Sequence, residues 1–189
     1  MERFVKEIIV DDIPEKGFSI RADEGDKWFL NTLSEALGDS YDGASKAFAM
    51  MDIVRYEQNV TIDGKLGFRF AGLCDRCLED FSKDRNLNLH VILVPSSTFS
   101  SENEGEDIEK FEDDLEFFTY EGDRFDLAEV IREQILLSKP MKELCSDGCK
   151  GLCQRCGKNL NEGSCQCKDE VGDPRFAPLK AFGKSDKKN

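Results

Sequence analysis

Histidine is almost absent from this chain, whose 189 residues contain one, His90, along with one tryptophan and five prolines. With a single imidazole, the chain has few groups suited to acid–base catalysis. His90 lies in a stretch of alternating residues that is typical of a strand. No glycine-rich phosphate loop, nucleophile elbow or HExxH motif occurs, and no pair of carboxylates is singled out by its spacing. We therefore expect a protein that is not an enzyme and has no small-molecule substrate.

Long apolar runs are also lacking, since the longest, such as Val91–Val94 and Ile135–Leu137, are far too short to cross a bilayer. The first ten residues, MERFVKEIIV, are too charged to form the core of a signal peptide. These features predict a cytoplasmic protein with no membrane partner. Thiols stay reduced in that compartment, so the eight cysteines favour metal binding over disulfides.

The net charge of −13 is unevenly distributed along the chain. Residues 1–138 contain 15 Lys and Arg against 32 Asp and Glu, whereas residues 139–189 contain 11 against 7. Nucleic-acid binding depends on cations that neutralise phosphates, so any RNA contact is expected in the last third. Residues 101–123 carry eleven acidic side chains and one lysine, which indicates a solvated acidic loop or, alternatively, a surface for a basic partner.

The hydrophobic pattern predicts an α+β fold. Short strands are expected at Phe4–Val10, Phe18–Ala22, Leu87–Val94 and Leu115–Tyr120, with a longer alternating stretch between Phe48 and Phe70. Asp63–Gly64 lies within that stretch, and an Asp-Gly pair between alternating runs is typical of a hairpin turn. The strands form an antiparallel sheet that could close into a barrel-like shape.

Two main helices accompany the predicted sheet. The first follows Asp26 as a candidate N-cap and ends at Gly38, and its apolar side chains share one face. The second, Phe125–Ser138, has Asp126 and Glu129 at capping-box spacing and is stopped by Pro140. We expect residues 1–140 to form an acidic core and residues 141–189 to form a basic, zinc-binding segment and tail packed on it.

The cysteines fall into four pairs, and zinc prefers four thiolates at tetrahedral corners. Four pairs therefore supply two structural zinc sites without an open coordination position. One set is compact and includes two glycines that ease tight turns; the other joins the centre of the chain to the segment after the second helix. Either Cys145 or Cys149 could instead join the C-terminal site. The expected sets are Cys74, Cys77, Cys145 and Cys149 for the first, and Cys153, Cys156, Cys165 and Cys167 for the second.

Other cysteine chemistries are less well supported by the sequence. A thioredoxin-like pair expects a βαβ context, whereas Cys74 and Cys77 lie between strands that look antiparallel. The CxxxCxxC spacing of Cys149, Cys153 and Cys156 occurs in radical S-adenosylmethionine enzymes, but only 33 residues follow Cys156 here. An ordinary iron–sulfur cluster held by four cysteines stays open as an alternative.

In this order, the motifs CDRC, IREQILLSKPMKELC, CKGLCQRCGKNLNEGSCQC and DPRFAPLKAF resemble the YceD family. Its members are called large ribosomal RNA subunit accumulation proteins. The resemblance covers roughly residues 74–182 and implies a role in the accumulation or processing of large-subunit ribosomal RNA. It implies no catalytic residue.

Two kinds of partner fit this role. Ribosomal RNA or a precursor of the large subunit could contact the basic side chains near the zinc ligands and beyond them, while the acidic body could alternatively bind a basic ribosomal protein. The candidate RNA-binding residues are Lys150, Arg155, Lys158, Arg175 and Lys180.

Overall fold

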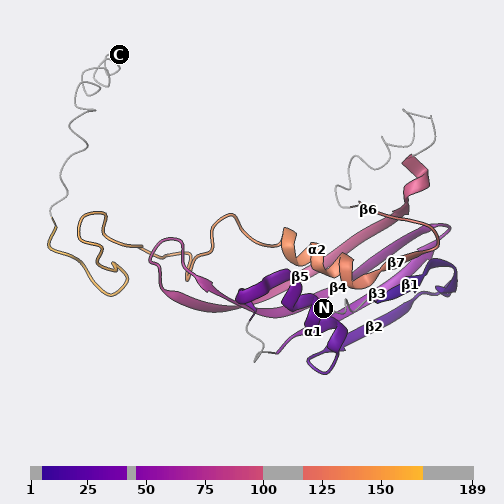
Figure 1. The fold of residues 1–189 in the computed structure, drawn as a ribbon, viewed down its shortest axis with the longest axis horizontal. Coiled ribbons are helices and arrows are strands. Elements are labelled where there is room, and N and C mark those ends of the chain that lie inside the picture. The colour runs from indigo at the N-terminus through magenta and orange to yellow at the C-terminus, as the bar shows by residue number, and fades with distance from the viewer. Residues whose placement is uncertain (1–5, 42–45, 100–116, 168–189) are drawn as a thin grey trace, which may run out of the picture.

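The computed structural model describes residues 6–41, 46–99 and 117–167, which form two sheets and two helices (Figure 1). The strands are β1 (Glu7–Ile9), β2 (Phe18–Asp23), β3 (Phe48–Tyr56), β4 (Asn59–Leu73), β5 (Asp80–Pro95), β6 (Phe117–Tyr120) and β7 (Arg124–Asp126). The helices are α1 (Lys27–Leu37) and α2 (Leu127–Leu137), with short 3₁₀ turns at Val10–Asp12, Gly38–Ser40 and Ser96–Phe99. Within these residues, no helix is long and apolar enough to cross a membrane.

The main sheet has the order β2-β3-β4-β5-β6. Strands β2 to β5 are antiparallel neighbours, as the meander predicts, but β6 pairs with β5 in the parallel direction. The expectation of a barrel-like sheet is wrong, because β2 and β6 lie at opposite edges and do not pair. A separate two-stranded sheet joins β1 to β7. The α+β class with two main helices is confirmed.

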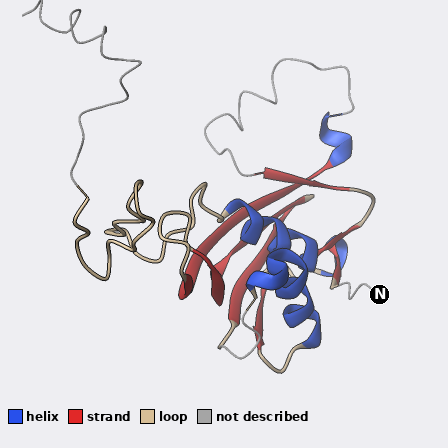
Figure 2. Cartoon of the chain, turned by 60° about the vertical axis from the view of Figure 1, so that its left-hand side comes forward, coloured by secondary structure: helices blue, strands red, loops and turns tan. Residues whose placement is uncertain are grey.

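Both helices lie on one face of the main sheet (Figure 2). Helix α1 ends where Gly38 adopts a positive φ of 57°, and α2 begins where the Asp126 carboxylate accepts a 2.9 Å hydrogen bond from the Ala128 N–H. The buried helix side chains pack with the inward-facing residues of the strands. The largest fully buried members of this core are Phe29, Ile13, Leu33, Met51, Ile53, Ile62, Leu66, Leu93, Leu127, Ile131, Ile135 and Val60.

The hairpin between β3 and β4 is not at the predicted position. Tyr56 pairs with Asn59 around a two-residue turn at Glu57–Gln58, where Glu57 has a φ of 56°. Gly64 instead lies inside β4, and a Cβ there would collide with the carbonyl oxygen of Met50. The glycine therefore serves a close approach between strands rather than a turn.

Strand β3 turns one of its two alternating sets of side chains toward the core. Ala49, Met51 and Ile53 are buried, while Phe48 and Met50, which belong to the apolar series of opposite parity, point away from the helices and are exposed. Alternation guarantees that the two sets lie on opposite faces.

Candidate metal centre

The first pair of cysteines lies in the connection between β4 and β5. The Cys74 N–H donates to the Glu79 carbonyl at 2.9 Å, and the Leu78 N–H donates to the Cys74 carbonyl at 2.9 Å. Leu78 closes this turn in the left-handed region, with a φ of 58°. The tight turn places both Cys74 and Cys77 in the interior.

The chain after α2 brings the other two cysteines of this cluster. Two hydrogen bonds join Glu143 to Asp75: the Asp75 N–H donates to the Glu143 carbonyl at 2.8 Å, and the Glu143 N–H donates to the Asp75 carboxylate at 2.7 Å. Arg85 on β5 forms a 2.6 Å ion pair with the Glu143 carboxylate. These contacts hold the segment against the hairpin immediately before Cys145.

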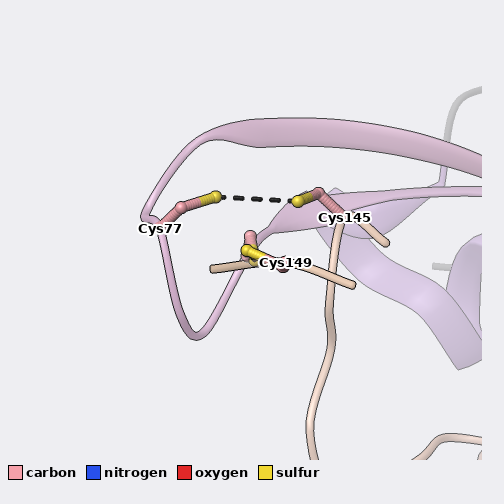
Figure 3. Close-up of side chains that lie close together, drawn as sticks. Cys77, Cys145 and Cys149 are labelled. Carbon is pink, nitrogen blue, oxygen red and sulfur yellow. Dashed lines mark hydrogen bonds between the residues drawn. The ribbon is translucent and has the colours of Figure 1, made fainter. Parts of the chain in front are cut away.

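The four thiols of the first cluster converge on one point. Figure 3 shows Cys77, Cys145 and Cys149 side by side, with Cys77 on the hairpin and the other two on the segment after α2. The Cys77 and Cys145 sulfurs lie 3.7 Å apart, as do those of Cys74 and Cys149, and all four lie within 4.8 Å of one another. Two thiolates bound to one tetrahedral zinc ion stand about 3.8 Å apart. The spacing therefore fits a single ion.

The second cluster repeats the same turn in a more exposed setting. The Cys153 N–H donates to the Lys158 carbonyl at 2.8 Å, and the Gly157 N–H donates to the Cys153 carbonyl at 2.9 Å. Gly157, with a φ of 71°, occupies the position of Leu78 in the first turn. The sulfurs of Cys153, Cys156, Cys165 and Cys167 also lie within 4.8 Å of one another, and Cys156 is exposed.

Hydrogen bonds and burial act in opposite directions on the thiols of the first cluster. Burial raises the pKa of Cys74, but backbone hydrogen bonds from Cys145, Cys77 and Arg76 outweigh it and bring that pKa to about 6. For Cys77, a backbone hydrogen bond from Glu79 lowers the pKa, while burial and the neighbouring thiols raise it to about 12. One thiolate thus forms readily and opposes ionisation of its neighbours, whereas a bound cation would stabilise all of them.

The second cluster has the same electrostatic asymmetry. Backbone hydrogen bonds from Cys156 and then Arg155 lower the pKa of Cys153 to about 6. The pKa of Cys167 is raised to about 12, first by its hydrogen bond with Cys156 and then by burial. Both clusters therefore contain the mixture of strongly and weakly acidic thiols that four converging sulfurs produce.

The two clusters are joined by side chains that the sequence analysis missed. The Asn161 amide, in the loop between Cys156 and Cys165, donates to the Cys149 sulfur at 3.3 Å and accepts from the Lys150 N–H at 2.8 Å. Arg76 donates to the Cys149 carbonyl at 3.0 Å, and its own carbonyl accepts from the Leu152 N–H at 3.1 Å. No sequence spacing identifies these contacts: Asn161 lies 12 residues from Cys149, and Arg76 lies 73 residues from it.

The candidate RNA-binding residues are only partly within the described chain. Lys150, Arg155 and Lys158 are exposed around the second cluster, and the Lys158 ammonium donates to the Ser164 carbonyl at 2.9 Å. Arg175 and Lys180 lie outside the described residues, as does most of the acidic block.

The single histidine lies on the surface of the main sheet. His90 is exposed on β5 and its Nδ1 lies 2.6 Å from the Asp63 carboxylate on the neighbouring strand. This is a cross-strand pair on the surface of the sheet.

Comparison with known proteins identifies the family. The model of the family described as large ribosomal RNA subunit accumulation protein YceD matches residues 62–183, which include both cysteine clusters. A chloroplastic YCED homolog 1 from Arabidopsis thaliana, named as a large ribosomal RNA subunit accumulation protein, is 26% identical over 74% of the chain. The protein of the same name from Zea mays is 40% identical over 30% of the chain.

The chain spans 49% of the length of the Arabidopsis protein and 20% of the maize protein in these matches. No solved structure shows significant similarity to it. The match over residues 62–183 covers more than half of the chain and contains all eight cysteines. The chain therefore belongs to the YceD family of large ribosomal RNA subunit accumulation proteins.

Proposed function

We propose that this protein is a non-enzymatic ribosome-biogenesis factor that supports the accumulation or processing of large-subunit ribosomal RNA. The single observation that carries the proposal is the family match, which gives the chain a role in large-subunit ribosomal RNA accumulation. The geometry adds that two closed sets of four thiols leave no ligand position for activated water, which favours structural over catalytic metal.

Each cluster holds one zinc ion in this proposal. The sulfur separations of 3.7 Å in the first cluster suit thiolates that share one ion. In a [4Fe–4S] cluster each thiolate binds a different iron, and in a [2Fe–2S] cluster the thiolates bind two irons in pairs, so not all four cysteine sulfurs would stand this close together. Bound zinc supplies folding energy, and the residues of this chain orient the thiolates through their backbone amides.

The zinc-bound segment presents Lys150, Arg155 and Lys158 to ribosomal RNA or to a precursor of the large subunit, and Arg175 and Lys180 are further candidate RNA-binding residues. The proposal also divides the chain into an acidic core (1–140) and a zinc-binding segment (141–189), and it places the protein in the cytoplasm. The charge difference between these two parts of the chain supports the assignment of RNA contact to the second.

A second candidate function is the binding of a basic ribosomal protein by the acidic body. The supporting observation is a groove of about 330 Å³ between β6, β7 and α2, whose lining includes Glu121, Glu129 and Glu133. Acidic side chains in a concave surface attract the lysines and arginines of such a partner.

Crosslinking in the source cells, followed by sequencing of the recovered RNA, tests the proposed function. Recovery of large-subunit ribosomal RNA or its precursors is expected, together with loss of mature large-subunit RNA when the protein is depleted. Recovery of no such RNA and normal subunit levels would contradict it. Native mass spectrometry should find two zinc ions per chain, whereas iron with a visible absorption band would contradict the metal assignment.

A further inference from the structure

The two cysteine clusters differ in their access to solvent. In the first, Cys74 is 0% exposed, Cys77 3% and Cys149 3%. In the second, Cys156 is exposed and the other three cysteines are only partly buried. Figure 1 shows the loop of the second cluster, coloured orange to yellow, beyond the β4–β5 hairpin and away from both helices. A small reagent in solution therefore reaches the thiols of the second cluster more easily.

Apolar packing covers the first cluster and not the second. Phe81, Leu144 and Leu152 pack against the buried cysteines of the first cluster. The cysteines of the second cluster are flanked in the chain by exposed polar residues, namely Gln154, Arg155, Ser164 and Gln166. The side chains around each set of thiols, rather than the thiols themselves, thus account for the difference in exposure.

The first cluster also has supports that do not depend on the second. The hydrogen bonds between Glu143 and Asp75, and the ion pair of Glu143 with Arg85, hold the segment before Cys145 against the hairpin. The end of the second loop is tied back by its sulfurs and by the Lys158 ammonium, which donates to the Ser164 carbonyl at 2.9 Å. Loss of an ion from the second cluster would therefore loosen this loop and leave the first cluster assembled.

The sulfurs of the second cluster are close enough to react with one another. The Cys153 and Cys165 sulfurs lie 3.4 Å apart, and all four sulfurs lie within 4.8 Å of one another. A disulfide bond is about 2.05 Å long, so a small movement of an exposed loop is enough to join two of them.

We propose that the second cluster is a peroxide-sensitive switch on the loop that carries two of the candidate RNA-binding residues. The exposed Cys156 thiolate attacks hydrogen peroxide, so that an S–O bond forms, the O–O bond breaks and hydroxide leaves. A second thiolate of the same cluster then attacks the sulfenic acid at its sulfur and displaces another hydroxide, which leaves a disulfide. The two thiolates supply the two electrons that reduce the peroxide. The zinc ion keeps only two protein ligands and is released.

The output of this switch is the position of Arg155 and Lys158, because both lie in the turn that the second ion holds. The Lys158 carbonyl accepts a 2.8 Å hydrogen bond from the Cys153 N–H, so the backbone of this lysine is part of the cluster's turn. The inference rests on the proposed function, which supplies both the zinc ions and the RNA partner. It adds a regulation that the first cluster, which is buried, does not share. Disulfides in reducing compartments are usually of this transient, sensing kind.

Titration of the zinc-loaded full chain with hydrogen peroxide tests the proposal, with a chromophoric chelator to record released zinc. One of the two zinc ions should be released, and two of the eight thiols should be lost. Peptide mass mapping should place the disulfide among Cys153, Cys156, Cys165 and Cys167. Dithiothreitol and added zinc should restore the second ion. Release of neither ion, of both together or of the first cluster's ion alone would overturn the proposal.

A variant that uncovers the first cluster tests whether burial protects it. Leu144→Ala removes one of the side chains packed on the buried cysteines, so peroxide should now release both ions. Leu137→Ala is the matched control, because Leu137 is an exposed leucine on α2, and this variant should still release one ion. Circular dichroism and the zinc content before treatment check that each variant is folded and loaded. Release of a single ion from loaded Leu144→Ala would contradict protection by burial.

Binding of large-subunit ribosomal RNA by the reduced and the peroxide-treated protein separates this inference from the proposed function. Weaker binding after oxidation, reversed by dithiothreitol and zinc, is expected. Equal binding in both states would overturn the switch and leave the proposed function standing. Binding in neither state would contradict the proposed function, and a chain that holds no zinc before treatment would contradict the metal assignment and this inference with it.

Discussion

Asn161→Ala is expected to weaken metal binding at a cluster to which Asn161 itself contributes no ligand. The Asn161 side chain lies in the loop of the second cluster, but its amide donates to the Cys149 sulfur of the first at 3.3 Å. It also accepts from the Lys150 N–H and donates to Asn159. Truncation to alanine removes all three hydrogen bonds and no thiolate.

The magnitude follows from the hydrogen bond to sulfur. Partners that orient a metal ligand typically change metal affinity about 10- to 100-fold, or about 1.4–2.8 kcal/mol. Asn161 is exposed, and water can partly replace its amide, so the lower end applies. We expect zinc affinity at the first cluster to fall about tenfold. Asn161→Asp should be worse than alanine, because a carboxylate beside a thiolate is repulsive.

Competition with a chromophoric chelator at fixed pH measures this effect. The titration is made in the full chain and in a Cys165→Ser, Cys167→Ser background, where zinc binding reports the first cluster alone. Asn88→Ala is the control, because Asn88 is an exposed asparagine on β5 remote from both clusters. Unchanged affinity of the first cluster in Asn161→Ala, or a loss confined to the second, would refute the reasoning.

Three further predictions concern stability. Removal of zinc by a chelator should increase hydrogen exchange in residues 143–167 and leave α1 protected, because the buried cysteines form a cluster separate from the main core. Equal loss of protection in residues 143–167 and in α1 would contradict this prediction. Phe29→Ala, at a fully buried position, should lower the free energy of unfolding in urea by about 3–5 kcal/mol, whereas Leu137→Ala, 68% exposed, should change it by less than about 0.5 kcal/mol; similar losses would argue against this core. Burial raises the pKa of Tyr120 above its ordinary 10.0, so the folded chain holds this proton more tightly than the unfolded chain does. The free energy of unfolding therefore falls as the pH rises above 10.0. Tyr120→Phe should reduce this alkaline loss of stability, and an unchanged pH profile would contradict the raised pKa of Tyr120.

The helices were the most predictable part of the fold. The apolar spacing around Phe29 and Leu33, and again around Val130 and Ile131, matches the helical repeat, and these side chains are buried in the structure. Helical spacing relates residues only a few positions apart, so it can be recognised directly in the sequence. The start of α2 at Leu127 rather than Phe125 arises because β7 extends to Asp126 and pairs with β1.

The strands were less predictable because an alternating pattern does not tell which of the two faces of a strand is buried. Alternation in β3 indicates that Phe48 and Met51 lie on opposite faces, but it does not indicate which face the helices cover. The hairpin at Glu57–Gln58 has no strong turn signal, whereas Asp63–Gly64 has one and lies inside a strand. The pairing of β4 with β3 outweighs the local preference there.

By itself, the sequence determined the α+β class, the two helices and the resemblance to the YceD family, because composition, helical periodicity and cysteine spacing are local properties. It also supplied two candidate sets of thiols, while leaving Cys145 and Cys149 free to join either. Only the tertiary structure brought these two cysteines to Cys74 and Cys77, placed Asn161 between the clusters and turned Phe48 away from the core. These arrangements depend on contacts between different segments of the chain, and no local sequence pattern specifies such contacts.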